Sequence, residues 1–170
     1  MSVDGDLQGD EGDDRRPTRP LERYLEVRAT VARTADEVGR LEFVLYEVDE
    51  LAEGQIGYAV GADDEDLTGD GPGQWRPLWL VIGEEALTGE TLLVDLEDDA
   101  LAVMVAVEDE DGWGEPVEIA SSLPLLAALL GELEAAARDR ATPAELLEIA
   151  LARTPDTAHA QWRAWLDGPA

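Results

Sequence analysis

The chain carries few side chains suited to nucleophilic or metal-dependent catalysis, and these do not form a known catalytic pattern. His159 is the single histidine, and neither lysine nor cysteine occurs. A zinc site would have to be built almost entirely from carboxylates, unlike the usual Cys and His ligand sets. None of the three serines lies in the Gly-x-Ser-x-Gly motif that presents a catalytic serine. Without lysine, Schiff-base chemistry is excluded. We therefore interpret His159 as a structural residue of a helix.

Carboxylates are abundant, but their clusters are more typical of solvated turns than of a catalytic pair. The clusters Asp63–Asp66 and Glu108–Asp111 give no indication of two carboxyl groups facing each other across a cleft. The six residues that start at Asp64 match the first half of an EF-hand loop, but its twelfth position is Trp75, where a bidentate Glu is needed. We therefore expect a protein that is not an enzyme, with no dedicated metal site and no cofactor.

The net charge of the chain is -28, with 40 acidic and 12 basic residues. Phosphate binding needs cationic side chains, so this balance disfavours direct contact with nucleic acid or anionic membranes and favours a basic protein partner. All the basic residues are arginine. An acidic, Arg-only composition is equally consistent with a GC-rich genome or a high-salt cytoplasm.

The chain shows no sign of secretion or membrane insertion. Its first ten residues lack both the basic start and the apolar core of a secretory signal. The longest apolar stretch, around Leu123–Leu130, is far shorter than the ~20 residues that span a bilayer. We expect a cytoplasmic protein.

Composition and hydrophobic periodicity divide the chain into three parts. Residues 1–17 are rich in Gly and Asp and have the composition of a disordered acidic tail. Residues 18–140 contain the main α+β domain, and residues 141–170 contain C-terminal helices that we expect to pack on the same domain. Apolar residues recur at helical spacing from Leu21 to Val38 and predict a helix there, although alternation between Leu25 and Val31 also permits a strand.

Short apolar runs bounded by Gly or carboxylates predict an antiparallel sheet between residues 41 and 107, interrupted by an exposed loop over residues 61–74. Helical periodicity then returns with N-cap signals at Ser122 and Thr142, and a last helix starts at Thr154–Pro155. The fold class is therefore α+β, with a mostly antiparallel sheet of about 4–6 strands covered by helices and a helical C-terminal extension. The expected strands are Leu41–Val48, Leu78–Ile82, Thr91–Leu96 and Leu101–Val107.

Two of the five tryptophans border the acidic, Gly-rich loops. Trp79 is expected in the core, whereas an amphipathic indole beside carboxylates is a common anchor of protein interfaces. We therefore predict a partner-binding surface made of two acidic loops and their tryptophans. The candidate residues are Asp63, Asp64, Glu65, Asp66, Trp75, Asp109, Glu110, Asp111 and Trp113.

The order of motifs between residues 41 and 133 resembles one known family. It consists of a Trp-led strand (WRPLWLVIG from Trp75), a strand after a Gly turn (GETLLVDL from Gly89), a Gly112-Trp113 pair and PVEIASSL before the leucine helix. This order is similar to that of the SUKH superfamily, which has Smi/Knr-type members and many bacterial immunity proteins. The resemblance implies an α+β domain for protein recognition, most often immunity against a cognate toxin such as a nuclease.

Three other functions are compatible with the same sequence. A small-ligand-binding protein or carboxylate enzyme would be favoured by a deep pocket with inward-facing carboxylates of raised pKa. An acidic DNA mimic would be favoured by carboxylates spaced along an elongated face, and the resembled family also contains scaffold-like regulators.

Overall fold

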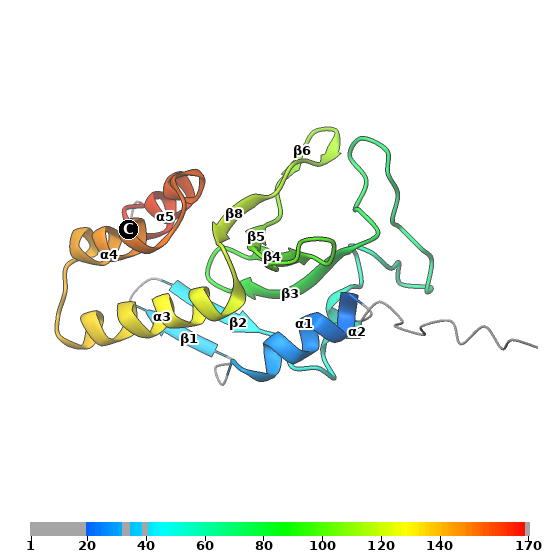
Figure 1. Cartoon of the computed structure of the whole chain (residues 1–170). Coiled ribbons are helices and arrows are strands. Elements are labelled where there is room, and N and C mark those ends of the chain that lie inside the picture. Colours follow the sequence, from blue (N-terminus) through cyan, green and yellow to red (C-terminus); the bar gives the residue numbers. More distant parts are fainter. Residues whose placement is uncertain (1–19, 32–34, 39–40, 169–170) are drawn as a thin grey trace, which may run out of the picture.

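The computed structural model describes residues 20–31, 35–38 and 41–168, and it has the predicted α+β fold. Six antiparallel strands form one sheet, and a two-stranded hairpin stands apart from it (Figure 1). In order across the sheet, the strands are β1 (Ala35–Val38), β2 (Leu41–Leu45), β3 (Trp79–Glu85), β4 (Glu90–Asp95), β5 (Val103–Val105) and β8 (Val117–Ala120). The hairpin consists of β6 (Glu108–Asp109) and β7 (Gly112–Trp113). The tail predicted at residues 1–17 lies outside the described residues.

Helices precede, interrupt and follow the strands. They are α1 (Pro20–Ala29), α2 (Leu51–Gly54), α3 (Leu123–Arg138), α4 (Pro143–Arg153), the 3-10 turn η1 (Asp156–Ala158) and α5 (His159–Leu166). In Figure 1, α4 and α5 lie at one end of the molecule, and the long connection between α2 and β3 lies at the other. Within the described residues, no helix combines the length and the apolar character needed to cross a membrane.

The N-terminal helix is shorter than predicted. The prediction of a helix from Leu21 to Val38 is wrong in its second half, since α1 ends at Ala29 and β1 pairs with β2 from Ala35 to Val38. A tight turn closes α1, in which the hydroxyl and amide of Thr30 both donate to the carbonyl of Val27. β-branched residues at this point lower helix propensity, and pairing with β2 then fixes the chain as a strand.

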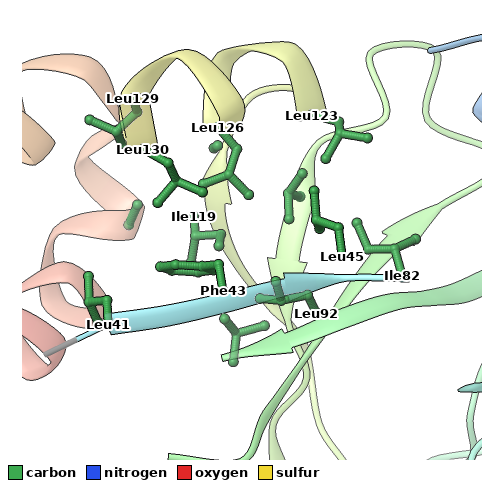
Figure 2. Close-up of a cluster of buried hydrophobic side chains, with 14 of the residues drawn as sticks. Leu41, Phe43, Leu45, Ile82, Leu92, Ile119, Leu123, Leu126, Leu129 and Leu130 are labelled. Carbon is green, nitrogen blue, oxygen red and sulfur yellow. The ribbon is translucent and has the colours of Figure 1, made fainter. Parts of the chain in front are cut away.

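Apolar side chains alternate between the two faces of the central strands, so the sheet has a buried cluster on each face. On β4, Leu92 and Val94 belong to the cluster under α3, whereas Leu93 belongs to the cluster on the opposite face. Figure 2 shows the leucines of α3 pointing onto the first of these faces. We call these the helix-side cluster and the loop-side cluster.

The helix starts predicted at Ser122 and Thr142 are confirmed, whereas the start predicted at Thr154–Pro155 is a 3-10 turn that leads into α5 at His159. The hydroxyl of Ser122 accepts the amide of Leu125 and caps α3, and Thr142 and Glu145 form a reciprocal capping box at α4. On α5, Trp162, Trp165 and Leu166 are buried, and the Trp162 indole donates to the carbonyl of Ile119 on the edge strand β8 at 3.0 Å. The C-terminal helices therefore pack in the helix-side cluster, and α5 also provides a hydrogen-bond donor to one carbonyl group of the edge strand β8.

Two arginines of α1 fasten this helix to the sheet. Arg23 donates to the carbonyls of Leu96 and Asp98 after β4. Arg28 is buried and donates to the carbonyls of Val31 and Tyr46, which ties the end of α1 to the end of β2. Since charged donors make stronger hydrogen bonds than neutral ones, these contacts hold α1 although its sequence is only weakly amphipathic.

Candidate functional site

The connection between α2 and β3 contains an irregular loop whose acidic turn is ordered by its own backbone. The amide of Gly61 donates to the carbonyl of Glu65 at 2.7 Å, and Asp64 adopts a positive φ of 60° within this turn. Asp66 accepts hydrogen bonds from the hydroxyl and the amide of Thr68, and these bonds lower the pKa of its carboxyl group below the usual value. The predicted residues Asp63, Asp64, Glu65 and Asp66 are all exposed.

The loop-side cluster lies beneath the second half of this connection and is strongly aromatic. The ring of Trp75 meets those of Trp79 and Trp113 edge to face, with centroids 5.3 and 5.1 Å away. The ring of Tyr58 lies 5.1 Å from Trp75 and 5.4 Å from Trp113. Edge-to-face pairs stabilise beyond the area that they bury, so these rings form a firm base.

Trp75 supports the surface from below instead of forming part of it. Its side chain is 1% exposed, and its indole N–H donates to the carbonyl of Trp79 at 3.0 Å. The prediction that Trp75 anchors a partner directly therefore needs correction, because a buried ring cannot touch another protein. Trp113 is half-buried and keeps part of its indole at the surface.

The loop and the β6–β7 hairpin meet at two glycines. The amide of Trp113 donates to the carbonyl of Gly73 at 3.0 Å. A Cβ on Gly73 would lie 2.1 Å from the carbonyl oxygen of Asp111, and a Cβ on Gly112 would lie 2.4 Å from the carbonyl oxygen of Gly73. Only glycines permit this approach, since both also have positive φ angles. The two segments, which are distant in sequence, thus lie side by side (Figure 1).

We call residues 70–74, Arg76 and residues 108–115 the junction surface. It includes the predicted candidates Asp109, Glu110, Asp111 and Trp113, and the three carboxylates are exposed. The carboxylate of Asp109 accepts the amide of Asp111 at 2.9 Å and shapes the tip of the hairpin. One predicted acidic loop thereby contributes its carboxylates and its tryptophan to one surface.

The Asp63–Asp66 turn is not part of this surface. It is tied to the start of the connection, since Val60 bridges to Asp66 and the amide of Leu67 donates to the carbonyl of Ala59. Among the described residues, no hydrogen bond joins this turn to the hairpin. Both predicted acidic loops are therefore exposed, and only the hairpin is joined to the junction surface by hydrogen bonds.

The predicted candidates do not include four charged residues of the junction surface, namely Asp70, Arg76, Glu108 and Glu115. A signal was available, since Arg76 is the sole basic residue between Arg40 and Arg138. Its guanidinium carbon lies 5.1 Å from the ring centroid of Trp79, and it pairs with Glu115 at 2.5 Å. A single cation in an otherwise acidic region is thus held by an indole and a carboxylate.

Two hollows open beside Arg76. The larger, of about 390 Å³, lies between residues 70–76 and 113–115 and includes Trp79 and Trp113 in its wall. The smaller, of about 170 Å³, is lined by Asp70, Arg76 and the carboxylates Asp95 and Glu97. Asp70 and Arg76 border both hollows, so the two hollows adjoin at these residues.

Two observations on the described residues bear on metal and acid-base chemistry. These residues contain no group of three or more His, Asp or Glu side chains placed to hold a metal ion. Besides Asp66, hydrogen bonds lower the pKa of the carboxyl groups of Glu132 and Glu145, through Arg153 and Thr142 respectively. A catalytic acid needs a raised pKa. His159 contacts the carbonyl of Leu151 at 3.1 Å, as expected for a structural residue of a helix.

Comparison with known proteins adds no assignment: no family model, curated protein or solved structure matches this chain.

Proposed function

We propose that the protein is a non-catalytic interaction domain that binds a basic protein partner through the junction surface. The observation that carries this proposal is the hydrogen bond between Gly73 and Trp113. It joins the acidic hairpin to the Gly-rich connection between α2 and β3 (residues 55–78), which we call the strap, above a buried aromatic base. Protein interfaces require both an anchor and a fixed shape. Here Trp113 offers the anchor, and the aromatic base fixes the shape.

The charge of the chain suits rapid association with such a partner. A net charge of -28 produces a long-range field that raises the rate of encounter with a basic protein and makes this rate sensitive to salt. The exposed carboxylates Asp109, Glu110 and Asp111 stand at the tip of the hairpin, where the partner would arrive. They would act on association more than on the lifetime of the complex.

A finer proposal follows from the resemblance to the SUKH superfamily. The partner would be a cognate toxin, and a nuclease is the basic toxin whose cleft an acidic surface would cover best. Under this proposal the chain is an immunity protein that acts in the cytoplasm. The acidic loop surface, rather than any catalytic group, would neutralise the toxin.

The test compares two variants of the junction surface against a candidate partner, obtained from a neighbouring gene or from capture by the protein. Replacing Asp109, Glu110 and Asp111 by their amides should slow association several-fold and flatten its salt dependence. Trp113→Ala should mainly speed dissociation, because it removes the anchor. Stopped-flow or biosensor kinetics at two salt concentrations separates the two effects.

A matched control changes three exposed carboxylates at the opposite end of the molecule. Asp139→Asn, Glu148→Gln and Asp167→Asn together remove the same charge from the helical end. If this control slows association as much as the hairpin variant does, the effect is one of net charge alone. If substitutions at the helical end abolish binding while both junction variants bind normally, the proposed surface is wrong.

A further inference from the structure

Arg76 occupies the junction surface in the way that a bound cation from another protein would. Its guanidinium stacks on Trp79 and pairs with Glu115, although half of its side chain remains exposed. Trp79 is only 5% exposed, and Arg76 is one of the groups that cover its ring. The surroundings of Arg76 therefore show which chemical group fits here, namely a flat cation between an indole and a carboxylate.

The space around Arg76 has room and charge for a second cation. The hollows on its two sides are bordered by the carboxylates Asp70, Glu115, Asp95 and Glu97, and Arg76 is the one cation of their lining. Within the described part of the chain, the side chains of Asp70 and Glu97 take part in no hydrogen bond or ion pair. The half-buried indole of Trp113 forms a further wall of the larger hollow.

We propose that the larger hollow binds an arginine side chain of the partner, which stacks against Trp113 and competes with Arg76 for Glu115. This inference rests on the proposed function and adds to it the chemical group that is recognised. The aromatic walls and the cation already stacked there carry the inference, since carboxylates alone would attract any basic group. Arg76 thereby lowers the affinity for weakly basic competitors, because an incoming cation must displace it or tolerate its charge.

Arginine is favoured over lysine by the geometry of the hollow. A guanidinium is planar, stacks on an indole and can still donate in its plane to a carboxylate, whereas an ammonium is a compact and strongly hydrated charge. Trp113 supplies the ring, and Asp70 and Glu115 stand at the rim of the same hollow. Trp79 and Glu115 already hold the guanidinium of Arg76 through a cation–π contact and an ion pair. Trp113 with Glu115 or Asp70 would hold a second guanidinium in the same way.

The probe is a blocked tripeptide, acetyl-Gly-Arg-Gly-amide, titrated into the ¹⁵N-labelled full chain. The five tryptophan indoles give separate reporters, so binding in the hollow should shift the Trp113 indole and the Gly114 amide and leave the Trp162 indole unmoved. The peptide with lysine should cause smaller shifts at the same positions, and the peptide with uncharged citrulline should cause almost none. These three peptides differ only in the group that the hollow is proposed to recognise.

Two variants with the same loss of charge test the role of Arg76. Arg76→Gln keeps an aliphatic stem over Trp79 but removes the competing cation, so the arginine peptide should bind roughly two- to fivefold more tightly. Arg163→Gln removes a cation from the exposed face of α5, away from the junction surface, and should change the affinity much less. A thermal melt of each variant checks that the fold is intact.

Three results would overturn the inference: shifts spread over the acidic surface, equal binding of the lysine peptide, or equal effects of Arg76→Gln and Arg163→Gln. None of them decides the proposed function, which depends on the kinetics of the hairpin variants with a protein partner. Conversely, specific binding of the arginine peptide together with normal partner binding by those variants would support the hollow and reject the proposed partner surface.

Discussion

The two faces of the sheet are buried in different ways. On the helix side, α3, α4 and α5 bring leucines onto the strands, and the rings of Trp162 and Trp165 on α5 contact the ring of Phe43 on β2 in tilted and edge-to-face pairs. On the loop side, four buried residues and a few aromatic neighbours lie under an irregular, Gly-rich strap. The backbone N–H and C=O groups of a helix bond to each other, whereas those of an irregular segment such as the strap depend on individual turns and tertiary contacts.

Because of this difference, we expect the helix side to determine the stability of the domain and the loop side to determine binding. The helix-side cluster is large and continuous, so it sets the stability of the whole domain. The loop-side cluster fixes the position of the junction surface, and we expect the strap above it to open more readily than the rest of the fold, because irregular segments have few regular hydrogen bonds. Changes on the loop side should therefore alter binding at a small cost in global stability.

The largest expected effect is that of Trp162→Ala, which should lower the free energy of unfolding by about 3–5 kcal/mol. The change removes the ring contacts with Phe43 and Trp165 and the hydrogen bond to the carbonyl of Ile119. Trp75→Ala should lower the free energy of unfolding by clearly less, because we expect the strap to detach while the helix-side cluster stays folded. Urea unfolding measures both variants.

Amide hydrogen exchange shows which part of the chain each of these two variants, Trp162→Ala and Trp75→Ala, destabilises. Trp75→Ala should speed exchange of amides in residues 55–77 and leave those of α3 protected, whereas Trp162→Ala should speed exchange throughout. If Trp75→Ala costs as much as Trp162→Ala and deprotects α3, the two clusters form one cooperative unit and the division proposed here is wrong.

The helix side was more predictable from sequence than the loop side. Leucines at helical spacing and caps at Ser122 and Thr142 are local signals, and the structure confirms them. The helix predicted to Val38 failed because pairing of β1 with β2 is a tertiary effect that outweighs local periodicity. The candidate site depends on such long-range contacts almost entirely.

At the junction surface, sequence patterns identified the acidic hairpin and Trp113 but not how they are assembled. The exposure of Asp109–Asp111 follows from composition. The burial of Trp75 does not, since an indole next to a Gly-rich loop is equally consistent with a surface anchor. The meeting of Gly73 with the hairpin joins segments about forty residues apart, and no local pattern encodes such an approach.

A smaller effect is expected from alanine at the two glycines with the same φ of 75°. At Gly89 a Cβ has open space, so Gly89→Ala should cost only backbone strain of about 1 kcal/mol. At Gly73 the same strain is joined by a clash with the carbonyl of Asp111. Gly73→Ala should therefore cost roughly 1 kcal/mol more and shift the Trp113 indole resonance.

The difference between the two glycine variants isolates the contact between strap and hairpin. Gly89→Ala leaves this contact untouched and should leave partner binding unchanged. If Gly73→Ala matches Gly89→Ala in urea unfolding and in the spectrum of Trp113, the close approach at Gly73 does not hold the junction surface together.

The smallest effect concerns one tyrosine from each cluster. The hydroxyl of Tyr58 bonds Thr91 at 2.6 Å, so Tyr58→Phe should cost about 0.5–1.5 kcal/mol. The hydroxyl of Tyr24 is buried and has no hydrogen-bond partner among the described residues. Tyr24→Phe should therefore change stability by less than ~0.5 kcal/mol or stabilise the fold, because it removes a buried polar group whose desolvation nothing offsets.

Alkaline pH tests the burial of Tyr24 through the ionisation of its hydroxyl. Burial raises the pKa of Tyr24 from 10.0 to about 12, although Arg28 nearby acts in the opposite direction. Unfolded tyrosine ionises near 10 while folded Tyr24 stays neutral, so its contribution to stability is complete below pH 10 and is lost as the pH rises to 12. Tyr24→Phe should lose less stability than the wild-type chain over this range, as measured by urea unfolding. An unchanged slope would mean that Tyr24 ionises like an exposed tyrosine, and that the helix side is looser around α1 than its burial indicates.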